Sequence, residues 1–240
     1  GLEKNMSSTQ QSIEVANSLV APVKGILAAD ESTGTIKRRF DSIGVESTVE
    51  NRRDYREMLF STQGASEFIS GVILYDETIR QEGNNGKLLV QLLSEQGIIP
   101  GIKVDMSTNP LAGSEGEVIT DGLDGLRGRL ADYVSLGAKF TKWRAVINIG
   151  EEIPTRYCIE TNAHALARFA GLTQEAGLVP IVEPEVLMDG DHNIETCYEV
   201  TSRCLREVYH QLGIQNIDLA GTLLKPNMVL SDASLPDRTM

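Results

Sequence analysis

The chain has 240 residues, of which 41% are hydrophobic, and it carries a formal net charge of -12. This composition allows one large globular domain and excludes a disordered chain, while the charge argues against broad binding to nucleic acid or to an anionic membrane. No apolar run approaches the ~20 residues needed to span a bilayer, and the amino terminus has no secretory signal pattern, so we expect a cytoplasmic protein.

Short apolar runs rich in β-forming residues recur along the chain, and we expect each to form a strand. They begin about every 39 residues, and segments with helical periodicity lie between them. This spacing is typical of βα units rather than hairpins, so we expect a parallel α/β sheet in a single domain of residues 1–240. The runs are residues 25–30, 68–76, 98–105, 139–146, 178–186 and 219–228.

The segments between these runs predict helices at residues 51–61, 87–95, 123–136, 159–176 and 194–212. The fourth of these has an apolar stripe that should pack on a sheet, formed by Ala163, Leu166, Ala167, Ala170 and Thr173 or Gln174. The glycines of residues 122–128 are spaced GxxGxxG and do not directly follow a strand. They therefore predict a loop that leads into a helix, not a nucleotide-binding loop.

Cysteine and histidine usage indicates neither disulfides nor a metal. The cysteines Cys158, Cys197 and Cys204 are odd in number and lack CxxC spacing, so we expect them to be reduced and structural. The histidines are scattered and no HExxH occurs, so we expect no metal and no cofactor.

Ionisable residues lie at or near the carboxyl ends of the six apolar runs. Ligands of parallel α/β sheets bind at that edge, and side chains two positions apart on a strand share a face. An ordinary lattice of buried ion pairs is the alternative, but so many charges at one edge favour a catalytic site. The residues are Asp30, Asp76, Lys103, Asp105, Lys142, Arg144, Glu183, Glu185 and Lys225.

Lys225 lies in the apolar segment of residues 221–229 and is followed by a proline. In an isolated run, such a lysine most often extends its charged end into solvent. An amine kept from water near other cations is instead partly neutral and nucleophilic, and can add to a carbonyl. Carboxyl groups nearby could then move protons while the iminium accepts electrons from a breaking carbon–carbon bond.

Five segments together resemble class I, Schiff-base fructose-1,6-bisphosphate aldolase. The resemblance extends from about residue 20 to residue 229, and the segments occur in the same order as in the family, so it is highly specific. It implies a TIM (β/α)8 barrel, of which this chain covers about six βα units, and a metal-free enzyme that acts on a phosphorylated ketose in a homotetramer. The segments are residues 25–34, 101–105, 142–144, 180–185 and 221–229.

The resemblance implies a role for each matching residue. Lys225 would be the Schiff-base nucleophile, Glu183 the acid and base for loss of water, and Asp30 the base that takes the C4 hydroxyl proton. Lys142 would polarise the intermediates. The residues that would support the lysines and the substrate are Glu185 and Arg144.

The same resemblance assigns the phosphate at the C6 end to Ser32, Thr35, Arg39 and Lys103. Taken alone, the basic cluster of residues 37–39 would indicate a solvated helix face, so the resemblance changes the interpretation of Arg39. Arg38 stands where many relatives have lysine. The difference is small if this position only supplies a positive charge to the phosphate, and larger if the geometry of the charged group matters.

The family has two further βα units, a phosphate site at the C1 end and a carboxy-terminal tyrosine, whereas this sequence ends at Met240. We therefore expect an aldolase fragment with a curled six-stranded sheet, unpaired first and sixth strands and little or no turnover. Two alternatives are another Schiff-base lyase or transaldolase-like enzyme for sugar phosphates, and a non-catalytic scaffold.

Overall fold

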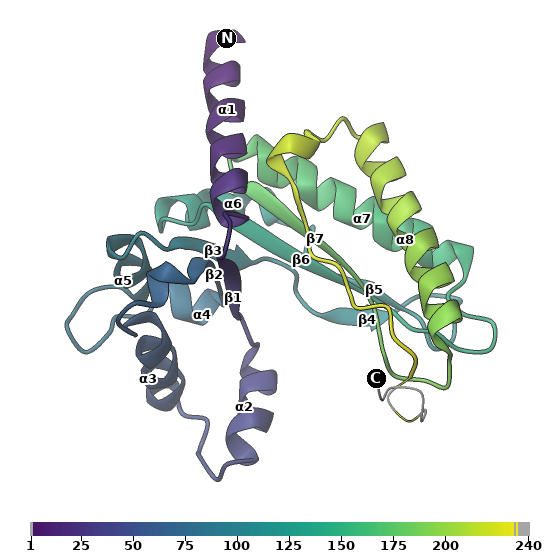
Figure 1. Cartoon of the computed structure of the whole chain (residues 1–240), viewed down its shortest axis with the longest axis horizontal. Coiled ribbons are helices and arrows are strands. Elements are labelled where there is room, and N and C mark those ends of the chain that lie inside the picture. The colour runs from purple at the N-terminus through teal and green to yellow at the C-terminus, as the bar shows by residue number, and fades with distance from the viewer. Residues whose placement is uncertain (1, 233, 235–240) are drawn as a thin grey trace. The chain divides into compact units, whose positions relative to one another are not determined.

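The computed structural model describes residues 2–232 and 234, with side chains from Thr9 onward, so Met240 lies outside the described residues. The chain divides into two compact units (Figure 1). The first contains Gly1–Lys103, Gly128–Thr141 and Ala176–Val179, and the second contains Val104–Arg127, Lys142–Glu175 and Pro180–Met240. A single domain across residues 1–240 stays a prediction.

Six strands form a sheet in the order β1-β2-β3-β6-β7-β8. Parallel pairing joins β1 to β2, β2 to β3 and β7 to β8. Each predicted run overlaps one of these strands, so the predicted parallel α/β class is confirmed. The bounds are β1 (Gly25–Ala29), β2 (Ile69–Leu74), β3 (Ile99–Lys103), β6 (Phe140–Ile147), β7 (Val179–Val186) and β8 (Leu223–Leu224).

The sixth run gives a strand of only two residues, much shorter than predicted. A 3-10 turn, Leu219–Gly221, occupies its first part because the Asp218 side chain accepts a hydrogen bond from the Ala220 amide at 3.0 Å. Pro226 has no amide hydrogen to continue the ladder beyond Lys225.

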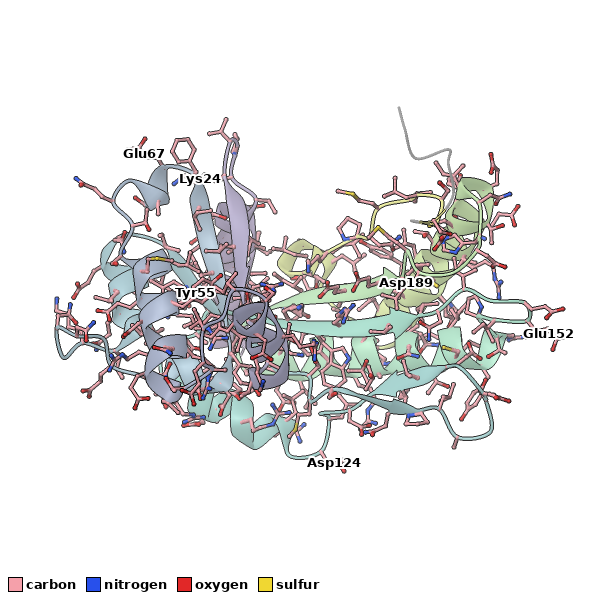
Figure 2. The ribbon with its side chains drawn as sticks, turned by 90° about the horizontal axis from the view of Figure 1, so that it is seen from below. Lys24, Tyr55, Glu67, Asp124, Glu152 and Asp189 are labelled. Atoms are coloured by element: carbon pink, nitrogen blue, oxygen red, sulfur yellow. The ribbon has the colours of Figure 1, made fainter. Side chains whose placement is uncertain are left out.

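The strands of the first unit enclose a tightly packed layer around Phe140, which is fully buried. A Cβ atom added at Gly101 would lie 2.4 Å from the Phe140 ring, and one at Gly71 would lie 2.5 Å from the Leu19 side chain and 3.1 Å from the ring. These positions favour glycine because Leu19 and the ring occupy the space that a side chain would need. Lys24, just before β1, donates to the Ser66 carbonyl at 2.7 Å (Figure 2).

Three described helices of the first unit were not predicted from the sequence: α1 (Leu2–Leu19), α2 (Thr33–Asp41) and the four-residue α4 (Asp76–Ile79). In α1, the described buried positions are Ser12, Ala16 and Leu19, so its apolar stripe is short and small. In α2, only Ile36 and Phe40 are buried, among several charged residues. The other helices centred in this unit are α3 (Val49–Phe60), α5 (Leu89–Glu95) and most of α6 (Leu126–Ser135).

In the second unit, helices α7 (Arg156–Glu175) and α8 (Ile194–Ile214) pack side by side (Figure 1). The predicted apolar stripe of α7 is buried from Ala163 to Thr173, whereas Gln174 is only half-buried. Trp143 of β6 stacks on Phe169 of α7 with ring centroids 5.5 Å apart. A short antiparallel hairpin, β4 (Thr108–Pro110) and β5 (Val118–Thr120), was not predicted because its strands are only three residues long.

Candidate active site

Lys225 and Glu183 meet because neighbouring parallel strands lie in register. Val182 pairs with Leu224, and the Lys225 amide then donates to the Val182 carbonyl at 3.0 Å. The next side chains along the two strands are Glu183 and Lys225, and the Lys225 Nζ donates to Glu183 Oε1 at 2.6 Å. The pairing of β7 with β8 therefore sets an amine directly against a carboxylate.

The surroundings of Lys225 differ from the sequence-based expectation of an amine kept from water near other cations. Its side chain is 44% exposed, whereas the Glu183 side chain is only 6% exposed. In the described part of the chain, the Lys225 side chain is therefore half-exposed, and its amine is paired with a buried carboxylate.

Lys142 approaches the same carboxylate from β6. Its Nζ lies 3.1 Å from Glu183 Oε2, and both side chains are buried. Glu183 thus lies between two amines, which compensate the cost of burying its charge. Lys142 is the third of eight residues in β6, so it lies within the strand and not at its carboxyl end as predicted.

A second ion pair lies two residues further along the same strands. Arg144 Nε donates to Glu185 Oε2, and both side chains are partly exposed. The buried Asp105 carboxylate accepts the Arg144 amide at 3.1 Å. The predicted same-face pair on β6 is Lys142 and Arg144, and the predicted pair on β7 is Glu183 and Glu185. Each cation of the first pair therefore contacts one carboxylate of the second.

Three of the predicted phosphate residues, Ser32, Thr35 and Arg39, lie where β1 is followed by α2. Ser32 caps α2, and its hydroxyl oxygen lies 3.1 Å from that of Thr35. Arg38 donates to the Thr35 hydroxyl at 3.3 Å, whereas Arg39 donates to Glu31 Oε1 at 2.5 Å. Hydroxyls and guanidinium groups at the first turn of a helix form a suitable environment for a phosphate.

Other predicted residues have separate positions in the first unit. Asp30 is buried directly after β1, and the half-buried Lys103 ends β3. Asp76 has a structural role instead, since it accepts hydrogen bonds from Tyr133 at 2.8 Å and from Arg80 at 3.0 Å.

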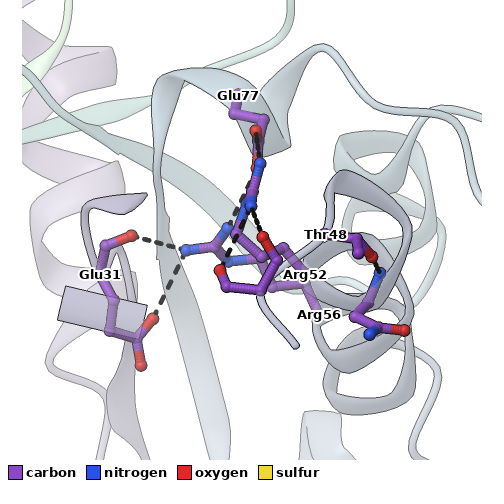
Figure 3. A network of polar contacts seen from close by, with 7 residues as sticks. Glu31, Thr48, Arg52, Arg56 and Glu77 are labelled. Carbon is purple, nitrogen blue, oxygen red and sulfur yellow. Dashed lines mark hydrogen bonds and ion pairs between the residues drawn. The ribbon is translucent and has the colours of Figure 1, made fainter. Parts of the chain in front are cut away.

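A buried network next to the Asp30–Ser32 turn was missed in the sequence (Figure 3). Arg52 donates to both oxygens of Glu77, at 2.9 and 2.7 Å, and Arg56 Nη2 donates to the Glu31 carbonyl at 2.7 Å. The hydrogen bonds from Arg52 lower the pKa of Glu77, while burial lowers the pKa of Arg56. Two arginines four residues apart in a predicted helix share a face, which was the available signal.

The three cysteines belong to an apolar cluster of the second unit. Cys158, Cys197 and Cys204 are free and buried in one apolar cluster, as predicted for reduced structural cysteines.

No group of three or more potential metal ligands occurs among residues 2–232 and 234. None of the helices in that part of the chain has the length and apolar composition needed to cross a membrane.

The family model for class I fructose-bisphosphate aldolase matches residues 11–240. The chain belongs to this aldolase family. It is 60% identical over 224 residues to a probable class 1 fructose-bisphosphate aldolase of Xanthomonas campestris pv. campestris, covering 93% of this chain and 67% of the relative. It is 54% identical to cytosolic fructose-bisphosphate aldolase 4 of Arabidopsis thaliana, covering 92% of this chain and 56% of that protein.

A solved aldolase structure confirms the fold. This is the Plasmodium falciparum fructose-bisphosphate aldolase in complex with TRAP and a small-molecule inhibitor, with a TM-score of 0.95 and 46% identity. The match covers 98% of this aldolase chain and 68% of the Plasmodium chain. The six-stranded parallel sheet is therefore part of an aldolase-type (β/α)8 barrel, as predicted.

Proposed function

We propose that Lys225 of this chain forms the Schiff base of the family reaction, the reversible aldol cleavage of fructose 1,6-bisphosphate to dihydroxyacetone phosphate and glyceraldehyde 3-phosphate. The observation that carries the proposal is the contact of Lys225 and Lys142 with the single buried carboxylate of Glu183 in a class I aldolase chain. Such a contact places a nucleophile, an acid–base group and a fixed positive charge within one small volume.

The first half of the reaction forms the Schiff base. Glu183 takes a proton from the Lys225 amine 2.6 Å away, and the neutral amine attacks the ketone carbon. Lys142 stabilises the negative charge that develops on the carbonyl oxygen, which takes up the second proton of the attacking amine and becomes the hydroxyl of a carbinolamine. Glu183 then returns its proton to this hydroxyl, which leaves as water while the iminium forms.

The second half breaks the bond between C3 and C4 of the ketose. Asp30 takes the proton of the C4 hydroxyl, and the electrons of the breaking bond move to the iminium to give an enamine. The aldehyde leaves first, and protonation and hydrolysis of the enamine release dihydroxyacetone phosphate. The ion pair of Arg144 and Glu185 supports the lysines and the substrate.

Phosphate recognition at the C6 end is assigned to Ser32, Thr35, Arg39 and Lys103. The hydroxyl pair at the start of α2 and the exposed guanidinium of Arg39 support this assignment. A cytoplasmic location and a homotetramer belong to the same proposal. The homotetramer follows from the family resemblance alone, and the cytoplasmic location is supported by Arabidopsis relatives that are named cytosolic.

Borohydride trapping with dihydroxyacetone phosphate tests the proposal. We expect one covalent label, located on Lys225 by peptide mass spectrometry, in the wild-type chain and none on that peptide in Lys225→Met. The matched control is Lys87→Met, because Lys87 is an exposed lysine whose partner is Glu95. Absence of the label from folded wild-type protein would refute the mechanism.

A further inference from the structure

Arg56 of α3 is a fully buried arginine. Its guanidinium donates a hydrogen bond to a backbone carbonyl in a turn that lies 25 residues earlier in the chain (Figure 3). Its Nη2 donates to the Glu31 carbonyl at 2.7 Å and lies 3.7 Å from the Glu31 carboxylate. Its Nη1 lies 3.8 Å from Glu77. The guanidinium therefore holds both the backbone and the side chain of Glu31.

Glu31 lies between Asp30 and Ser32 in the sequence, so a constraint on Glu31 also restrains both neighbours. Its other carboxylate oxygen accepts a hydrogen bond from Arg39 at 2.5 Å. A continuous set of contacts thus runs from Arg56 through Glu31 to Arg39. It fixes the turn that carries Asp30 and Ser32, two of the residues assigned to catalysis and phosphate binding, and it reaches the guanidinium of Arg39.

The alternative is that Arg56 serves only the stability of the unit. Its Nε and Nη1 atoms are buried and have no hydrogen-bond partner among the described residues, and Glu77 is already bonded at both oxygens by Arg52. A buried guanidinium satisfied in this incomplete way is a poor stabiliser compared with apolar packing. Its strongest contact is instead the one with the turn.

We propose that Arg56 is a positioning residue that holds the Asp30–Ser32 turn and Arg39 in place for the phosphate on C6. This inference rests on the proposed function. Arg56 itself is not expected to touch the substrate. Its effect should therefore appear in the recognition of that phosphate and not in Schiff-base formation itself.

The test compares two ketoses by borohydride trapping on Lys225 in the full chain, so it does not depend on turnover. Fructose 1,6-bisphosphate carries the phosphate on C6, and fructose 1-phosphate lacks it. For Arg56→Met we expect the half-saturating concentration of the bisphosphate to rise about tenfold, as for loss of one charge-assisted hydrogen bond, and that of fructose 1-phosphate to stay unchanged.

The control is Arg53→Met, because Arg53 lies on the same helix but pairs at the surface with Asp54. It should preserve the wild-type preference for the bisphosphate. Arg56→Lys keeps the charge but not the planar donor group, and should give an intermediate preference. If Arg56→Met does not fold, as judged by circular dichroism, Arg56→Lys and Glu31→Gln carry the test.

Folded Arg56 variants with the wild-type preference would overturn the inference, as would an equal loss of affinity for both ketoses. A wild-type chain that forms the Schiff base equally well with both ketoses would also overturn it, while leaving the Schiff-base mechanism intact. Failure of the proposed function is distinguishable, because the wild-type chain would then show no label on Lys225 with either ketose.

Discussion

Glu117 provides the sharpest test of how the second unit is held together. This buried carboxylate accepts hydrogen bonds from the Thr155 amide at 3.0 Å, the Thr155 hydroxyl at 2.5 Å and the Ser114 hydroxyl at 2.6 Å. Thr155 directly precedes α7, so the negative charge also lies at the amino-terminal end of that helix. Glu117→Gln removes the charge while preserving the shape of the side chain.

The expected loss follows from these contacts. The hydroxyls can rotate to accept from the new amide, so the hydrogen bonds persist but lose their charge. That change costs about 0.5–1 kcal/mol for each of the three bonds, and loss of the interaction with the helix dipole costs about 0.5 kcal/mol. We expect the free energy of unfolding of Glu117→Gln at pH 7, measured by urea titration with circular dichroism, to fall by about 2–3.5 kcal/mol.

The pH dependence has a defined sign. Burial by itself would raise the pKa of Glu117, but the hydrogen bonds from Ser114 and Thr155 outweigh it and lower the pKa below its usual value. The stabilisation is therefore complete above the unfolded pKa of about 4.3 and is lost as the pH falls through the folded pKa. The difference between wild type and Glu117→Gln should shrink below about pH 4.

Glu160→Gln is the matched control, because Glu160 lies on α7 and pairs at the surface with Arg156. It should cost about 0.5 kcal/mol or less. Equal stability of Glu117→Gln and wild type at pH 7, or a deficit of the same size at pH 7 and at acid pH, would refute the reasoning.

Three further predictions concern the active site, the packing and the thiols. Glu183→Gln should slow borohydride trapping about 100-fold at saturating ketose, and an unchanged rate would exclude its role in proton transfer. Gly101→Ala should cost about 1–3 kcal/mol in urea unfolding because its new methyl group meets a buried ring, whereas Gly128→Ala, in open space on α6, should be neutral or stabilising. Burial and a hydrogen bond with a carboxylate raise the pKa of Cys158 to about 12. At pH 8 the Cys158 thiol of the folded protein should therefore react with a disulfide reagent at least about 100-fold more slowly than that of the protein unfolded in urea. Comparable rates would contradict its burial.

Much of the fold could be predicted because its strands are buried and spaced by helices. The apolar runs located all six sheet strands, and the stripe from Ala163 to Thr173 located the buried face of α7. Helices α1 and α2 were missed because few apolar residues mark their buried faces. Periodicity detects an element only when its buried face is chemically distinct from its exposed face.

The candidate site was partly predictable for the same reason. Charged residues in apolar strands stand out, and spacing of two along a strand indicated which of them share a face. The sequence could not show which partner each would have. The sequence also predicted a Lys225 amine kept from water, whereas in the described structure the Lys225 side chain is half-exposed and its amine contacts Glu183.

The sequence by itself determined the parallel α/β class, the aldolase family and the identity of the charged residues near the strand ends. These properties depend on local composition, periodicity and short motifs, which can be seen along one chain. Only the tertiary structure decided that Glu183 lies between Lys225 and Lys142, and that Arg56 is buried against the turn at Glu31. Both contacts join residues at least 25 positions apart, so they depend on strand register and on helix packing, which no local pattern specifies.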